Sequence, residues 1–142
     1  MAKRKPGVDS VNASKKFNLA AGNFKMYAKR FPLSAASYYV RVLTEDIING
    51  QYVGVISGNL RRSFKPVPGS LGTAIVRQDG QIAPYAVNVA ERTIRKYGKS
   101  FMVLTTQRTK PRILDTSLVT FRTMQQATNK RKKYIYRNLF PA

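Results

Sequence analysis

The sequence contains neither cysteine nor histidine. Without cysteine the chain can form no disulfide bond, no thiolate nucleophile and no zinc–cysteine site. Without histidine it lacks the commonest general base and metal ligand. Most hydrolytic mechanisms lose their usual residues as a result. We therefore expect a protein that is not an enzyme and that binds no cofactor and no metal ion.

Acidic residues are also few, since six Asp and Glu oppose 26 Lys and Arg and give the 142-residue chain a formal net charge of +20. Such a charge makes isolated copies repel one another and attracts polyanions. The composition points to nucleic acid, an anionic membrane surface or an acidic protein surface as the partner. No apolar run is long enough to span a membrane, and no signal peptide follows the first charges, so we expect a cytosol-like compartment.

The positive charge is concentrated at both ends of the chain. Residues 1–30 carry 8 basic residues and 1 acidic residue, residues 31–91 carry 5 and 4, and residues 92–142 carry 13 and 1. A chain of this length forms one domain by default, and charged ends around a nearly neutral centre indicate a core with basic extensions. We expect a basic N-terminal arm at 1–30, a core domain at 31–120 and a basic C-terminal helix or tail at 121–142.

Apolar residues recur at helical spacing in three segments. A marginal helix is expected over 17–31, after a polar start at 3–7 that gains structure only with a partner. Pro32 is predicted to break the chain before a second helix that runs from a cap at Ser34 to about residue 48. The last helix is predicted to begin at an Asp115 cap and to continue through the basic tail.

Between these helices, short runs of β-branched and aromatic residues alternate with Gly, Pro and Asn. This texture predicts strands at 52–56, 62–67, 73–77 and 101–106, with a hairpin-type turn at Asp79-Gly80. Residues 85–95 fit either a short helix or an extended crossing segment. The expected fold class is α+β, with a small antiparallel β-sheet packed against a helix before it and a C-terminal helix, and with basic N- and C-terminal extensions.

Two short motifs stand about twenty residues apart in the middle of the chain. Residues 57–64 read Ser-Gly-Asn-Leu-Arg-Arg-Ser-Phe, and residues 83–91 read Ala-Pro-Tyr-Ala-Val-Asn-Val-Ala-Glu. In order and spacing they resemble the motifs of the small head-tail connector and tail-completion (neck) proteins of tailed bacteriophages. The likeness extends over roughly residues 33–120.

The resemblance implies a virion structural protein, assembled in the host cytoplasm, that forms a homo-oligomeric ring at the phage head–tail junction. Its partners would be other neck, portal-adaptor or tail proteins around the DNA channel, with nonspecific DNA contact as a secondary role and no membrane partner. The resemblance also implies that Gly58 adopts an unusual backbone angle and that Leu60 anchors the turn in the core. One of Arg61 and Arg62 would face a neighbour, because adjacent residues of a strand point to opposite faces.

Charged and aromatic residues outside the expected core are the candidates for contact with a partner. Glu91 is the only acid between Asp79 and Asp115 and stands beside Arg92, which favours a structural or inter-subunit salt bridge over catalysis. The C-terminal segment interleaves cations with aromatics, as tails that contact phosphate or anchor an interface do. The candidate residues are Arg61, Arg62, Glu91, Arg92, Lys130, Arg131, Lys132, Lys133, Tyr134 and Arg137.

The alternative is a basic nucleic-acid-binding protein of ribosomal or chromatin type, which the net charge and the basic tails suit equally well. Against it, several aromatics lie in apolar runs, where core packing is favoured over base stacking: Tyr38, Tyr39, Phe64 and Tyr85. For the basic tail, docking onto an acidic protein is favoured over tight DNA binding, because a junction ring must let DNA pass.

Overall fold

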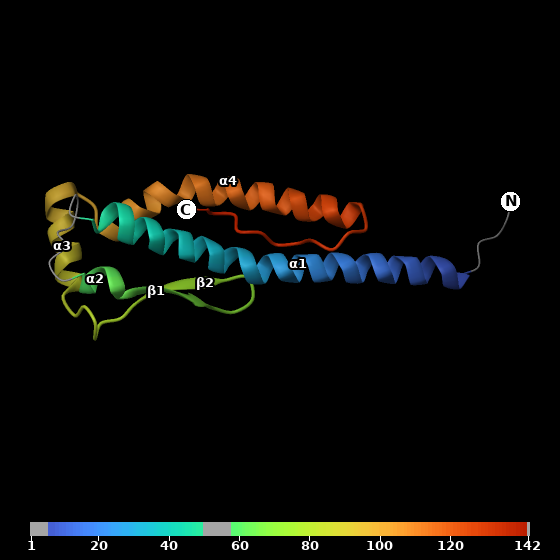
Figure 1. Ribbon diagram of the computed structural model, residues 1–142, viewed down its shortest axis with the longest axis horizontal. Coiled ribbons are helices and arrows are strands. Elements are labelled where there is room, and N and C mark those ends of the chain that lie inside the picture. Colours follow the sequence, from blue (N-terminus) through green and yellow to red (C-terminus); the bar gives the residue numbers. More distant parts are fainter. Residues whose placement is uncertain (1–5, 50–57, 142) are drawn as a thin grey trace.

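The computed structural model describes residues 6–49 and 58–141, which form an α+β fold. In chain order the elements are α1 (Pro6–Val42), the π-helical turn η1 (Leu43–Ile47), α2 (Asn59–Arg62), β1 (Phe64–Pro68), β2 (Ala74–Gln78), α3 (Ala86–Tyr97) and α4 (Phe101–Asn129). Figure 1 shows α1 between α4 on one side and the β1–β2 hairpin on the other, with α3 across one end. The predicted class is confirmed: the fold is α+β, with a small antiparallel sheet that follows one long helix along the chain and precedes a C-terminal helix.

The two long helices pack as an antiparallel pair (Figure 1), since early residues of α1 contact late residues of α4. Asn23 donates to the Thr128 hydroxyl at 2.9 Å, and the Tyr39 hydroxyl donates to the Met102 carbonyl at 2.8 Å. These bonds join residues more than 60 positions apart in the sequence. They fix the register of α4 along α1.

Buried threonines line part of α4. Thr105, Thr109 and Thr120 are at most 2 % exposed, and each hydroxyl donates to the carbonyl four residues earlier at 2.6–2.8 Å. A hydroxyl that is satisfied within its own helix costs little to bury. These side chains therefore serve as small core residues and need no partner from a neighbouring element.

The first core cluster lies around η1. The Ile48 N–H donates to the Leu43 carbonyl at 2.9 Å, five residues back along the chain, so the turn is wider than an α-helical one. Leu43, Ile47 and Ile48 are all buried as a result. The buried members of this cluster are Leu43, Ile47, Ile48, Leu60, Phe64, Ala83, Ala86 and Phe101.

The second core cluster depends on the end of the chain. Phe140 is 3 % exposed, and its ring stacks on that of Tyr38 with centroids 4.7 Å apart. Phe31 and Val42 complete the cluster. Figure 1 shows the segment after α4 running back between α1 and α4 to reach this point. The helix predicted through the basic tail is therefore wrong beyond Asn129, because the extended chain buries Phe140 against α1 instead.

The predicted helix boundaries at Pro32 and Asp115 are also wrong. Pro32 lies inside α1, and Ser34 caps no helix but contacts the hydroxyl of Tyr136. A proline removes one helical hydrogen bond, and the buried residues on both sides of it hold α1 together. Asp115 lies inside α4, which begins fourteen residues earlier with Ser100 as its N-cap.

The strand predicted at 101–106 is the first part of α4. Phe101 and Thr105 are buried one helical turn apart, so packing overrides the β-propensity of this stretch. Residues 85–95, for which the sequence allows two conformations, belong mostly to α3. The turn at Asp79-Gly80 leads into α3 and not to a further strand.

The strands predicted at 62–67 and 73–77 are confirmed to within two residues as β1 and β2, with Val67 opposite Ile75. The strand predicted at 52–56 lies outside the described residues. Both predicted domain boundaries, at residues 30 and 120, fall inside long helices. The polar start that was expected to lack structure already belongs to α1 at residues 6 and 7.

Candidate functional site

The first motif folds as a tight turn that begins at Gly58. This glycine has φ 73° and ψ 0°, a left-handed conformation that residues with a Cβ adopt at a cost. Leu60 is buried in the first core cluster, and the Ser63 hydroxyl donates to its carbonyl at 2.7 Å. The backbone angle at Gly58 and the anchoring role of Leu60 are therefore as the resemblance implies. Ser57 lies outside the described residues.

The two arginines of this motif have different surroundings. Both lie in the single helical turn α2 and not in a strand. Arg61 is half-buried, and its Nε donates to the Thr44 carbonyl at 3.0 Å. Arg62 is exposed and donates to the Asn59 side chain. Arg61 therefore holds α2 against η1 within the chain, and Arg62 is the one that a neighbour can reach.

The second motif forms the turn into α3 and its first turns. Ala83 and Ala86 are buried, and the Thr93 hydroxyl is satisfied by the Val89 carbonyl at 2.8 Å. Glu91 and Arg92 are exposed on the outer side of the same helix. The motif therefore uses its small residues for packing and leaves Glu91, next to Arg92, at the surface. Tyr85, for which the sequence favoured core packing, is exposed as well.

The two motifs meet in one core cluster. Leu60 and Phe64 of the first motif pack in the same cluster as Ala83 and Ala86 of the second. The ring of Phe64 also contacts Phe101 at the start of α4, edge to face at 5.9 Å. This end of the molecule consequently combines a small apolar core with exposed charges of both signs.

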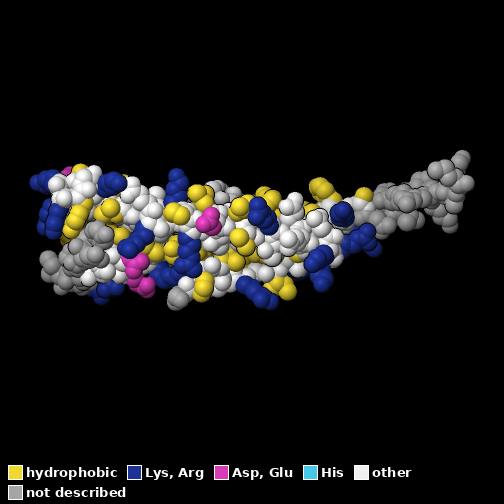
Figure 2. All heavy atoms as spheres, turned by 90° about the horizontal axis from the view of Figure 1, so that it is seen from above, with side chains coloured by type: hydrophobic (Ala, Val, Ile, Leu, Met, Phe, Trp, Pro, Cys, Tyr) yellow, Lys and Arg dark blue, Asp and Glu magenta, His cyan; other side chains and the backbone are white. Residues whose placement is uncertain are grey.

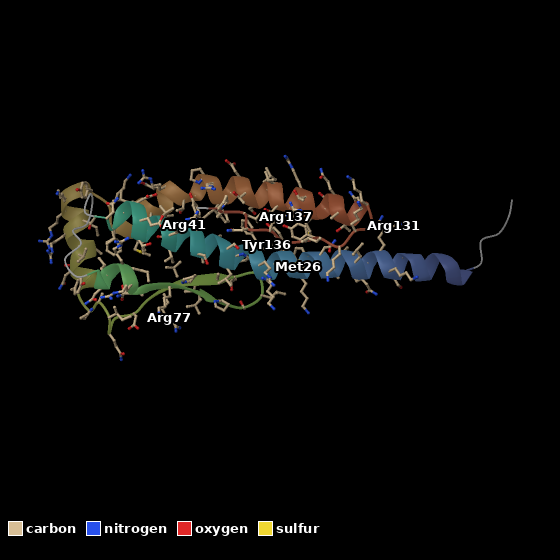
Figure 3. The ribbon with its side chains drawn as sticks, viewed as in Figure 1. Met26, Arg41, Arg77, Arg131, Tyr136 and Arg137 are labelled. Carbon is tan, nitrogen blue, oxygen red and sulfur yellow. The ribbon has the colours of Figure 1, made fainter. Side chains whose placement is uncertain are left out.

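The basic run Lys130–Lys133 forms the turn that follows α4. Lys130 caps the helix, and Arg131 reverses the chain with φ 58°. The Lys132 N–H donates to the Ala127 carbonyl at 2.7 Å. All four side chains of the run are exposed. Their charges therefore gather at one end of the body, with Arg131 at the turn in Figure 3.

Asn23 holds the returning tail to α1. It is 2 % exposed, and its amide group donates to the Thr128 hydroxyl at 2.9 Å and to the Lys132 carbonyl at 3.2 Å. Its side-chain oxygen accepts the Tyr134 N–H at 2.8 Å. The sequence offered no sign of this role, because Gly22-Asn23 reads as an interruption of the helical pattern.

A pocket of about 340 Å³ lies where the tail passes α1. Figure 3 shows Met26 and Tyr136 at this place. Tyr134 is buried beneath it, and burial raises the pKa of its hydroxyl, with smaller contributions from Tyr136 and Tyr27. Two cations and four apolar or aromatic side chains surround the space. The lining residues are Met26, Arg30, Lys133, Tyr134, Ile135 and Tyr136.

Alternate residues of the tail differ in exposure. Tyr134 is buried and Tyr136 half-buried, whereas Ile135 and Arg137 are exposed, as in an extended chain packed on one face. Of the sequence candidates, Tyr134 is therefore a packing residue and Arg137 a surface residue. Arg30 was missed, since nothing in the sequence sets it apart from other exposed lysines and arginines of α1.

Two further arginines contact the end of the chain or the ring on which it packs. Arg41 donates to the Phe140 carbonyl at 2.8 Å and to the Pro141 carbonyl at 3.2 Å. Arg112 lies 5.0 Å from the centre of the Tyr38 ring and 5.9 Å from that of Phe140. Both cations therefore stabilise the second core cluster through hydrogen bonds and cation–π contacts.

Lysine and arginine side chains are scattered over the face seen in Figure 2, and a group of them lies at the end where α3 is placed. Within 6–49 and 58–141, no group of three or more Asp, Glu, His or Cys side chains gathers as metal ligands would. No helix in these ranges is long and apolar enough to cross a membrane. Comparison with protein-family models, curated proteins and solved structures found no match.

Proposed function

We propose that this chain is a structural protein that assembles into an oligomeric ring at the head–tail junction of a tailed phage. The observation that carries the proposal is the joining of the two motifs in one core cluster through Leu60, Phe64, Ala83 and Ala86. Motifs that are separate in the sequence build a single end of the molecule. A shared core of this kind would hold both motifs in place under one assembly surface, as expected for the neck proteins that the sequence resembles.

The exposed charges at this end suit contact between unlike faces of neighbouring copies. Arg62 and Arg92 supply positive charge, and Glu91 supplies a carboxylate on the same end. A ring needs a heterologous interface, in which one patch of a subunit meets a different patch of the next. A carboxylate of one copy facing an arginine of the next would both attract and orient the subunits.

Negative-stain electron microscopy of the full-length protein at moderate salt tests the proposal. We expect rings from the unmodified chain and their loss in the variant Glu91→Lys, because the only carboxylate of α3 becomes a cation. Lys65→Glu on β1 is the matched control, since it also changes one exposed charge but lies outside both motifs. Single particles without rings under all salt conditions would overturn the proposal.

Nonspecific binding of nucleic acid is the second candidate function. It is favoured by the pocket between α1 and the tail, where Arg30 and Lys133 stand beside tyrosines. Cations with aromatic rings are the usual means of holding phosphates and bases. If this is the main role, changing Lys130–Lys133 to glutamine lowers the slope of log affinity against log salt by about 0.9 for each lost contact with duplex DNA. An unchanged slope would argue against it.

A further inference from the structure

The N-terminal part of α1 projects beyond the rest of the molecule. Figure 1 shows it extending past the ends of α4 and of the hairpin. Among the side chains that the structure describes, Asn23 is the first of α1 to be buried. The seventeen residues before it span about 25 Å of helix. Residues 13–18, 21 and 22 are exposed. Helices in proteins gain most of their stability from packing, so a partner along this segment would stabilise it.

An apolar stripe leads from the core onto this segment. Phe17, Phe24 and Phe31 follow one another at intervals of seven residues, which returns nearly to the same side of a helix. Phe31 is 7 % exposed in the second core cluster, whereas Phe24 is 53 % and Phe17 73 % exposed. The side of α1 that is buried in the body therefore continues uncovered along the projecting segment.

Cations flank the exposed part of the stripe. Lys15 and Lys16 precede Phe17, and Lys25 follows Phe24, all of them exposed. The sequence has no acidic residue between Asp9 and Glu45. The surface is consequently apolar along its middle and only positively charged at its edges.

A second copy of this chain is a poor match for that surface. In an antiparallel pair that opposes Phe17 with Phe24 of the other copy, Lys16 would oppose Lys25. Other exposed apolar residues of a second copy would also bring mainly cations toward Lys15, Lys16 and Lys25. Val87 and Ile94 on α3 have a single carboxylate, that of Glu91, among several arginines and lysines. Leu114 and Leu118 on α4 likewise have only that of Asp115 close to them in the sequence. Like charges across an interface oppose association.

We infer that the projecting part of α1, together with the exposed residues Phe24 and Lys25 at its base, docks an acidic amphipathic helix of a different protein. Apolar residues of that helix, at positions i, i+3 or i+4 and i+7, cover Phe17 and Phe24. Its Asp and Glu residues face Lys15, Lys16 and Lys25. This contact goes beyond the proposed ring, which joins copies of this chain, and it holds whether or not the ring forms.

A labelled model peptide tests the inference on the full-length protein. The peptide has three heptads with leucine at positions a and d and glutamate at e and g, and a second peptide has the same composition in scrambled order. Fluorescence anisotropy at physiological salt is expected to show binding of the patterned peptide at least about tenfold tighter than of the scrambled one. General attraction between opposite charges would give equal affinities and would overturn the inference.

Matched variants localise the binding. Phe17→Ala with Phe24→Ala is expected to weaken the patterned peptide about tenfold or more, with an unchanged circular dichroism spectrum because both side chains are exposed. Val87→Ala with Ile94→Ala is the control, since these residues are also seven apart and are 68 % and 48 % exposed. The control is expected to change the affinity less than about twofold.

Three outcomes would overturn the inference. One is equal weakening by the two double variants. Another is self-association of the unmodified protein that is lost with the phenylalanines, which would make a second copy the occupant. The third is binding to vesicles of phosphatidylserine and phosphatidylcholine that depends on the phenylalanines and is not inhibited by the peptide. The ring is scored separately by microscopy, so either result stands if the other fails.

Discussion

The two halves of α1 share one helix and one spacing of phenylalanines but differ in everything that surrounds them. In the covered half, which begins at the buried Asn23 and runs to Val42, Phe31 is 7 % exposed; in the bare half, residues 6–22, Phe17 is 73 % exposed, and Phe24 at the boundary is 53 % exposed. The periodicity of the sequence is the same in both. The difference shows that the spacing of apolar residues predicts which side of a helix is apolar. Whether that side is buried depends on the rest of the chain.

The covered half owes its burial to elements that are distant in the sequence. α4, the hairpin and the tail all pack against α1. The tail contributes two large side chains, Tyr134 at 4 % and Phe140 at 3 % exposure. Stability is therefore expected to be concentrated in this half, and the bare half is expected to tolerate change.

Removing the tail should have the largest effect. A chain that ends at Lys132 loses the burial of Tyr134 and Phe140 and exposes Tyr38. Losing one buried aromatic costs about 3–5 kcal/mol, so the free energy of unfolding should fall by at least about 4 kcal/mol or the chain should fail to fold. Urea unfolding of the full and shortened chains measures this. An unchanged midpoint would contradict the tail's place in the core.

Substituting equivalent phenylalanines compares the two halves directly. Phe31→Ala is expected to lower the free energy of unfolding by about 3–5 kcal/mol, because it leaves a cavity in the second core cluster. Phe17→Ala is expected to change it by no more than about 0.5 kcal/mol, because the ring is already exposed. Thermal and urea melts of the two variants provide the comparison. Similar losses in the free energy of unfolding for the two variants would show that Phe17 is buried in solution too.

The sequence predicted the elements whose signals are local. β1 and β2 appear where β-branched residues stand between Pro and Gly, and their ends differ by at most two residues from those predicted. The turn at Gly58 and the core position of Leu60 also agree. Each of these features depends on a few neighbouring residues, so a short stretch of sequence contains the information.

The sequence misled where distant packing determines the outcome. Pro32 does not end α1, because the buried residues before and after it contact the same body. Residues 101–106 favour a strand by propensity, yet Phe101 and Thr105 are buried side by side on a helix. The apolar residues of the tail have helical spacing in the sequence, yet the tail is extended. The extended conformation places Phe140 against Tyr38. Local propensity amounts to tenths of a kcal/mol per residue, whereas one buried aromatic is worth several times more.

The candidate site was predictable only in part. Exposure of Arg62, Glu91, Arg92 and Lys130–Lys133 agrees with a surface role. Arg61 and Tyr134 are instead tied into the fold, and neither the pattern of charges nor that of aromatics distinguishes them from their neighbours. Only the tertiary structure shows which carbonyl or core a given side chain reaches.

A smaller effect is expected from substituting Asn23 and Asn18, which lie in different halves of α1. Asn23→Ala leaves the Tyr134 N–H and the Lys132 carbonyl without their partner, which should cost about 1–3 kcal/mol. Asn18→Ala on the bare half should be neutral or slightly stabilising, because Asn18 is exposed and alanine favours the helix. Chemical denaturation of both variants measures the difference. Equal effects would show that Asn23 does not hold the tail.

The smallest effect is expected from alkaline pH. Burial raises the pKa of Tyr134 above its usual value of 10.0 in the folded protein, so the folded state retains the proton that the unfolded state loses first. This stabilisation is complete below about pH 10 and is lost as the pH rises through the folded-state pKa. Melting temperatures measured between neutral pH and about pH 11 should therefore fall less steeply for Tyr134→Phe than for the unmodified chain. Equal slopes for Tyr134→Phe and the unmodified chain would contradict the burial of Tyr134 in the covered half.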